Sequence, residues 1–120
     1  MGVRDGVRHS LARWADSGDQ EERDLRAQHG VAGVSPIAEA PDRTPVLLRG
    51  TLRTVTLMPR GGVPSLEAEI SDGTGVVTLV WLGRRHIAGI EPGRALSVQG
   101  RVGRHEHRRV LYNPRYELMP

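Results

Sequence analysis

The feature that most constrains the fold of this chain is a turn, Asp72-Gly73-Thr74-Gly75, between two alternating apolar segments. Residues 66–70 precede it and residues 76–81 follow it. A chain that reverses between two strands needs residues that tolerate positive φ, and Asp-Gly followed by a second Gly meets that need. The pattern therefore predicts a β-hairpin centred on this turn.

The same alternation continues through the last two thirds of the chain and predicts five strands. They are expected at residues 46–57, 65–71, 76–81, 94–103 and 109–118. Gly50 lies where a long, bent strand needs a residue without Cβ, and Pro114 indicates an edge or a kink. Residues 58–64 and 104–108 are predicted loops, and residues 82–90 a short helical or irregular crossover closed by Glu91-Pro92-Gly93.

The alternation also assigns each strand residue to a face. With a bulge after Leu52, the residues predicted to point inward are Leu48, Gly50, Leu52, Val55, Leu57, Leu66, Ala68, Ile70, Val77, Leu79, Leu96, Val98 and Val102. The residues predicted to point outward are Arg49, Thr51, Arg53, Glu67, Glu69, Val76, Thr78, Val80, Ser97, Gln99 and Arg101. The inward set is large enough to predict one small core.

The first third of the chain has a different character. Val7, Leu11 and Trp14 have helical spacing, and Ser17-Gly18-Asp19 is expected to end that helix. Residues 20–28 are predicted to form a second, charged helix with Asp19 as its cap, and the prolines of residues 30–45 are typical of a linker. We therefore expect a helical, partly mobile extension over residues 1–43, ordered only where Trp14 docks on the barrel or on a partner, and a barrel domain over residues 44–120.

The basic residues narrow the class of partner. All 17 are Arg, whose planar guanidinium contacts phosphates bidentately and stacks on bases. Residues 1–45 hold 6 Arg and 8 acidic residues (net −2), whereas residues 46–120 hold 11 Arg and 6 acidic residues (net +5). The positive charge belongs to the predicted barrel, which favours a polyanionic partner.

Together these segments resemble a known family. The long first strand with Gly50, the Asp-Gly-Thr-Gly hairpin, the crossover and the run from Glu91 to Val102 look like an OB-fold nucleic-acid-binding domain, which is mainly β and forms a five-stranded Greek-key barrel. The ending, residues 110–118, is similar to the close of the wedge domain in RecG-type branch-migration helicases. The whole chain looks like the small stand-alone OB-fold DNA-binding proteins of actinobacteria.

The resemblance implies a binding site on the outer face of the second and third strands, flanked by the loops at residues 58–64 and 103–109. Arginines would contact phosphates there, and bases would stack on flat side chains. The residues assigned to this nucleic-acid site are Arg49, Arg53, Arg60, Trp81, Arg84, Arg85, Arg104, Arg108, Arg109 and Tyr112. Single-stranded or branched DNA is the favoured ligand, with RNA as an alternative.

Several of these residues have a structural alternative. Arg49 and Arg53 would form cross-strand ion pairs with Glu67 and Glu69 if the first two strands are neighbours. Trp81 would be a core residue or a rim residue on which a base stacks. The arginines of Arg84-Arg85-His86 and of the loop at residues 103–109 would be solvated charges or phosphate contacts.

No residue pattern indicates catalysis or a cofactor. The phosphate-binding, hydrolase-elbow and zinc-protease motifs are missing, Cys is absent, and His105-Glu106-His107 has poor spacing for a metal, so no metal site is expected. No segment is apolar enough to be a signal peptide or membrane span, and the lack of Cys fits a reducing cytoplasm. We therefore expect a non-enzymatic cytoplasmic protein that binds nucleic acid. The alternative is a protein-interaction module whose N-terminal helix contacts a partner or a second copy.

Overall fold

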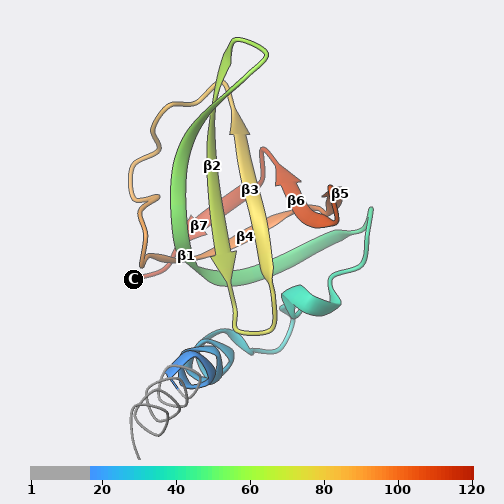
Figure 1. The fold of residues 1–120 in the computed structure, drawn as a ribbon. Coiled ribbons are helices and arrows are strands. Elements are labelled where there is room, and N and C mark those ends of the chain that lie inside the picture. The colour runs from blue at the N-terminus through green and yellow to red at the C-terminus, as the bar shows by residue number, and fades with distance from the viewer. Residues whose placement is uncertain (1–16) are drawn as a thin grey trace, which may run out of the picture.

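The computed structural model describes residues 17–120 and is mainly β (Figure 1). The strands are β1 (Pro45–Arg60), β2 (Val63–Ser71), β3 (Val76–Leu82), β4 (Ala95–Arg101), β5 (Gly103–His105), β6 (Arg108–Tyr112) and β7 (Arg115–Leu118), and a 3-10 turn, η1 (Ile37–Glu39), precedes them. Residues 17–29 are helical. The strands curl into a half-barrel, and the helix lies outside one end of it (Figure 1). The helix predicted from Val7, Leu11 and Trp14 lies outside the described residues.

The strands form one sheet in the order β5-β6-β3-β2-β1-β4-β7. Every neighbouring pair is antiparallel except β3 and β6, which are parallel. Val102 alone separates β4 from β5, yet β4 pairs with β1 whereas β5 pairs with β6. This short link joins β5, at one end of the strand order, to β4, the last strand but one at the other end, so the sheet has to curl.

The sheet has seven strands rather than the predicted five. The predicted strand at residues 94–103 is divided at Val102 into β4 and β5. The predicted strand at residues 109–118 is divided at Asn113-Pro114, where Asn113 has a φ of 49°. Because Pro114 cannot donate to a ladder, the chain leaves β3 after β6 and pairs with β4 as β7.

The two predicted loops beside the expected binding face are tight hairpins, so the bounds predicted for these loops, residues 58–64 and 104–108, were too wide. β1 continues to Arg60 and β2 starts at Val63, with Gly61 and Gly62 at φ values of 56° and 80° between them. Two positive φ values match a two-residue turn to the twist of the strands. Glu106 and His107 play the same part between β5 and β6. The β1–β2 hairpin projects beyond the rest of the sheet (Figure 1).

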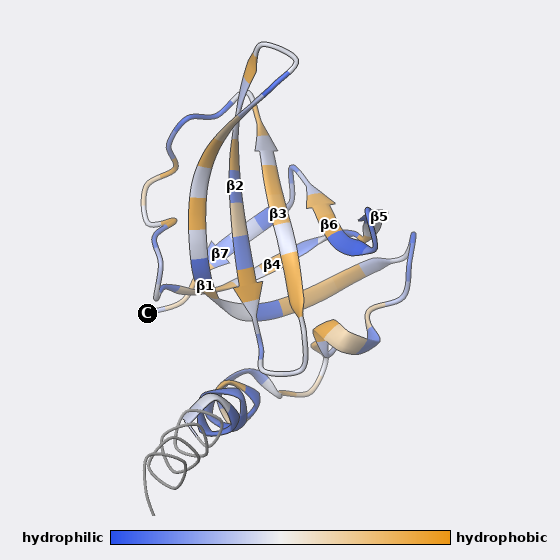
Figure 2. Cartoon of the chain, viewed as in Figure 1, coloured by the Kyte–Doolittle hydropathy of each residue, from blue (hydrophilic) through white to orange (hydrophobic). Residues whose placement is uncertain are grey.

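The core confirms most of the predicted inward set, including the irregularity between Leu52 and Thr54. Leu57 is an exception, being 51% exposed, because it lies on the projecting hairpin. Thr78 and Val80 point outward as predicted, because they pair with Glu69 and Glu67, yet both are buried. β3 has a neighbour on both sides, and Val80 lies between the longer side chains of Glu67 and Tyr112. Apolar residues occupy most of β3, with the polar Thr78 among them (Figure 2).

The N-terminal segment also differs from its prediction. Residues 17–29 are one helix, so the break at Ser17-Gly18-Asp19 and the cap at Asp19 were wrong. Within the predicted linker, Ile37 and Ala40 are buried among the core residues. The residues that follow the helix therefore pack against the sheet instead of spanning a gap.

Candidate nucleic-acid interface

One face of the sheet carries the groups expected to meet a ligand. Side chains of directly paired residues share a face, and the register places Met58, Ser65 and Leu82 in one row. The next row holds Thr56, Glu67, Val80 and Tyr112. We call this side of β1, β2, β3 and β6 the outer face. Its exposed large apolar side chains are Met58, Val63, Leu82 and Tyr112, and Tyr112 is 48% exposed.

An ion pair neutralises the acidic residue at the centre of the outer face. Arg60 Nε donates to Glu67 Oε1 at 2.9 Å, and Arg60 Nη2 contacts the same oxygen. The hydrogen bond to Glu67 raises the pKa of Arg60 above its ordinary value. Arg60 was predicted to contact phosphate, but in this arrangement it cancels the charge of Glu67, which would otherwise repel a phosphate.

β6 contributes both a basic and an aromatic side chain to the outer face. Successive strand residues alternate between faces, so Arg108 shares the face of Tyr112, four positions along the strand. Arg109 lies on the other face, where its Nη2 donates to the carbonyl of Ala38 at 2.8 Å. Of the two adjacent arginines, the structure therefore offers Arg108 to a ligand on this face.

The remaining predicted arginines are spread over other parts of the surface. Arg84 and Arg85 are exposed just after β3, next to Leu82. Arg104, on β5, donates from Nε to both carboxylate oxygens of Asp42 at 2.8 Å. Within residues 17–120, no ion pair forms at Arg84, Arg85 or Arg108.

Trp81 belongs to the core rather than to the rim. Its side chain is 5% exposed, and its Nε1 donates to the carbonyl of Pro114 at 3.3 Å. The ring meets Tyr116 edge to face, with centroids 5.7 Å apart. Among residues 17–120, the exposed aromatic rings are those of Tyr112 and Tyr116, on β6 and β7.

The predicted ion pairs from Arg49 and Arg53 do not form in the described part of the chain, so this prediction was wrong. The irregularity between Leu52 and Thr54 shifts the register and places Thr54 opposite Glu69. Thr54 Oγ1 donates to Glu69 Oε1 at 3.0 Å. Both arginines lie instead near the end of the sheet where the helix docks.

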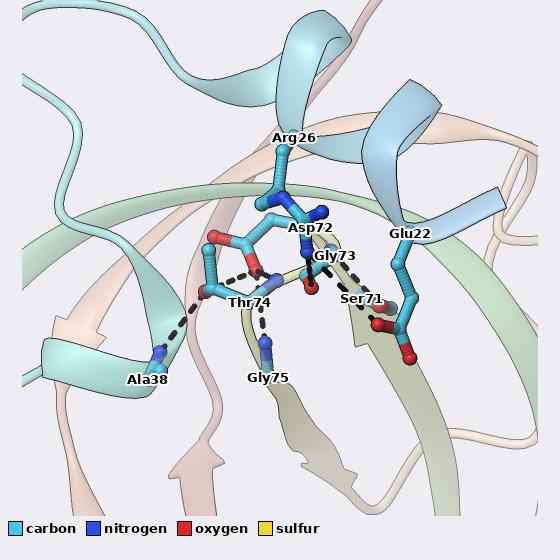
Figure 3. Close-up of polar contacts among 8 residues, drawn as sticks. All are labelled: Glu22, Arg26, Ala38, Ser71, Asp72, Gly73, Thr74 and Gly75. Atoms are coloured by element: carbon cyan, nitrogen blue, oxygen red, sulfur yellow. Dashed lines mark hydrogen bonds and ion pairs between the residues drawn. The ribbon is translucent and has the colours of Figure 1, made fainter. Parts of the chain in front are cut away.

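The Asp72 carboxylate organises the turn from which the sequence analysis started (Figure 3). Its Oδ1 accepts from Thr74 N at 2.9 Å, Thr74 Oγ1 at 2.6 Å and Gly75 N at 3.2 Å. A short side chain that bonds its own backbone two residues on is the reason why Asp favours such turns. Asp72 is buried, and this role could be predicted from the sequence.

The same turn also holds the N-terminal segment, which sequence reasoning missed. Asp72 Oδ2 accepts from Ile37 N at 2.9 Å, and Thr74 Oγ1 accepts from Ala38 N at 3.2 Å. Arg26 Nη1 donates to the carbonyl of Gly73 at 3.1 Å (Figure 3). These partners are 35 to 47 positions apart in sequence, so no local pattern marks them.

His29 ends the helix as a buried residue that the sequence analysis did not select. It is 2% exposed, and its Nε2 lies 2.9 Å from Thr51 Oγ1 in a hydrogen bond, whereas its Nδ1 has no partner in the described structure. Burial lowers the pKa of His29, the charge of Arg49 lowers it further, and Asp72 acts in the opposite direction. The imidazole is therefore held in its neutral form.

Two remaining structural observations concern metals and membranes. Among residues 17–120, no three side chains of His, Asp or Glu gather where they could hold a metal ion. No helix in this described range is long and apolar enough to cross a membrane.

Comparison with known proteins finds a likeness in fold. No protein-family model and no curated protein matches the chain. Among solved structures, it is similar to RecG bound to a three-way DNA junction, with a TM-score of 0.60 and 20% identity. The match covers 72% of this chain and 12% of the RecG chain. At this identity the likeness concerns the fold, and it supports a relationship to a fold found in a DNA-bound protein.

Proposed function

We propose that this protein is a non-enzymatic OB-fold barrel that binds nucleic acid, with single-stranded or branched DNA as its ligand. The parallel pairing of β3 with β6 and the link between β4 and β5 support a Greek-key barrel in which five strand positions are divided into seven segments. The fold likeness to the DNA-bound RecG chain supports the ligand class.

The observation that carries this proposal is the composition of the outer face. Tyr112 offers an exposed ring beside Leu82, and Arg108 lies four residues from it on the same strand, about 13 Å away. Arg84 and Arg85 follow Leu82 at the end of β3. A base stacked on Tyr112 would have cations on either side for its neighbouring phosphates, which is the arrangement that single-strand binding requires.

Salt dependence follows from this arrangement. If Arg84, Arg85 and Arg108 each neutralise one phosphate, log affinity should fall against log salt with a slope of about −2, since each contact to a single strand contributes about −0.7. Between about 50 and 200 mM salt the affinity should then drop about 20-fold. Stacking on Tyr112 would provide the part that salt leaves unchanged.

The test is fluorescence anisotropy with labelled oligo-dT, a linear duplex and a forked duplex at those two salt concentrations. Arg84→Gln with Arg85→Gln should reduce the slope by about 1.4. Arg94→Gln with Arg101→Gln, which removes two exposed arginines elsewhere, is the charge-matched control. An equal loss of affinity and slope in both double variants would mean that net charge alone attracts the ligand. Equal affinity for forked and linear duplex would exclude a preference for branched DNA.

The exposed apolar residues of the β1–β2 hairpin favour a second candidate, a protein-interaction module. Leu57, Met58 and Val63 are exposed on this projection. If the folded protein binds none of the three probes at low salt, and Met58→Ser with Val63→Ser changes its oligomeric state in sedimentation, the protein-interaction function is favoured instead.

A further inference from the structure

The N-terminal segment that docks on the Asp72 turn is acidic, whereas the sheet beneath it is basic. Residues 17–40, which we call the strap, contain five acidic residues and two arginines. Asp72, Thr74 and the carbonyl of Gly73 hold this segment through Ile37, Ala38 and Arg26. His29 adds a buried hydrogen bond to Thr51 of β1. The strap is therefore fixed at three places along its length.

The turn is shaped to receive the strap. A Cβ at Gly73 would overlap the carbonyl oxygen of Glu22, and a Cβ at Gly75 would lie 3.2 Å from Ala38 N. Gly73 has a φ of 86°, which the turn itself requires. Gly75 does not have a positive φ, so its backbone conformation does not require glycine. Its missing side chain instead allows η1 to approach closely.

The strap lies beside two of the arginines assigned to the nucleic-acid site, of which Arg53 is exposed and Arg49 is half-buried. Arg53 lines a cavity of about 390 Å³ together with Glu21 and Glu22 of the helix. Arg49 is half-buried, and its charge acts on His29. Glu22 pairs with Arg26 rather than with Arg53 in the described structure, but two carboxylates that line the same cavity repel a phosphate that approaches Arg53.

We propose that the strap is autoinhibitory: docked on the Asp72 turn, it keeps nucleic acid away from Arg49 and Arg53, and its release adds these arginines to the binding surface. This inference rests on the proposed nucleic-acid-binding function. The strap and the nucleic acid exclude each other at this end of the sheet, so each weakens the binding of the other by the same factor.

The sharpest test compares two glycine variants of the full chain. Gly73→Ala places a methyl group against Glu22 and should release the helix of the strap. Gly93→Ala introduces an alanine at a similar φ of 91° between β3 and β4, where nothing lies within 4 Å, and serves as the matched control for backbone strain. Hydrogen exchange of the amides in residues 17–40 reports whether the strap is released, and anisotropy with oligo-dT reports binding.

A second pair of variants tests the same idea while the glycines of the turn stay unchanged. Glu21→Gln with Glu22→Gln removes the two carboxylates beside Arg53. Glu91→Gln with Glu117→Gln changes the net charge equally at exposed positions outside the strap. Both double variants should bind oligo-dT more tightly because each removes two negative charges. The additional gain in affinity of the Glu21/Glu22 variant over the Glu91/Glu117 variant therefore measures how strongly the strap masks Arg53.

We expect Gly73→Ala to expose the strap amides and raise oligo-dT affinity about five-fold or more at low salt, with a steeper salt dependence. Gly93→Ala should bind oligo-dT with the same affinity as the wild-type protein. A strap that is released while affinity stays constant or falls would overturn autoinhibition and leave the proposed function standing. Failure of both the wild-type and the released protein to bind any nucleic-acid probe would instead overturn the proposed function and this inference with it. Equal gains in the two Glu pairs would also overturn autoinhibition.

Discussion

Substitution of Asp72 gives the most direct measure of how the turn joins two distant parts of the chain. Asp72→Asn keeps one carbonyl oxygen but places an amide NH₂ where a second acceptor stood, opposite Ile37 N or the donors of the turn. A hydrogen bond to a charged group contributes about 1.5–3 kcal/mol, and a buried donor left without an acceptor costs a similar amount. We expect Asp72→Asn to lower the free energy of unfolding by about 2 kcal/mol.

Asp72→Ala extends the same reasoning. It removes the acceptors of four donors: Ile37 N, Thr74 N, Thr74 Oγ1 and Gly75 N. We expect a loss of about 4 kcal/mol, near the upper end for a point substitution.

Urea unfolding measures both losses, and hydrogen exchange at Ile37 N shows whether the strap bond itself is broken. Asp42→Asn is a suitable control because its carboxylate forms only an exposed pair with Arg104 in the described structure, worth at most about 1 kcal/mol. If Asp72→Asn matched the wild-type free energy of unfolding with Ile37 N still protected, the carboxylate would not hold the strap and the reasoning would fail.

Two further predictions concern a buried base and the core. Because burial and Arg49 lower the pKa of His29 in the folded protein and Asp72 only partly opposes them, the unfolded chain takes up a proton first as the pH falls below about 6.5. The contribution of His29 to stability is therefore full above that pH and is lost as the pH falls to the lowered pKa of the folded protein. Urea unfolding of the wild type and of His29→Gln should give free energies that diverge in this window, whereas parallel pH profiles would contradict the assignment. Leu79→Ala, at a fully buried position, should lower the free energy of unfolding by about 2–5 kcal/mol, whereas Leu57→Ala on the projecting hairpin should lower it by less than about 1 kcal/mol. Thermal unfolding measures both losses, and similar losses would mean that the hairpin is packed against another part of the protein.

The sequence predicted the parts of the fold that depend on local alternation. The hairpin at Asp72, the bulge after Leu52 and most of the inward set follow from period-two patterning and turn chemistry. Gly61-Gly62 also carried a two-residue turn signal, but the flanking Pro59 and Pro64 made the segment look like a loop. Prolines are tolerated there because the projecting strands have free edges.

What could not be predicted depends on contacts between distant segments. Nothing near Ile37 in the sequence shows that its amide meets a carboxylate 35 residues away. The same holds for the candidate site, where Arg60 is engaged by Glu67 and Arg104 by Asp42. The sequence identifies arginines as candidate phosphate contacts, but only the tertiary structure distinguishes those already paired within the protein from those available to a ligand.

The two halves of β1 pair with different strands, and this difference predicts the order in which the sheet folds. Its last residues pair with β2 only a few positions away, with Arg60 opposite Val63, whereas its first residues pair with β4, with Pro45 opposite Arg101. Local pairings cost little loop-closure entropy, and distant ones cost more. The β1–β2–β3 meander should therefore assemble early, and the pairing of β1 with β4 should be the late event that completes the curled sheet. Destabilising substitutions in the second half of β1 should slow folding, whereas those in the first half should mainly speed unfolding.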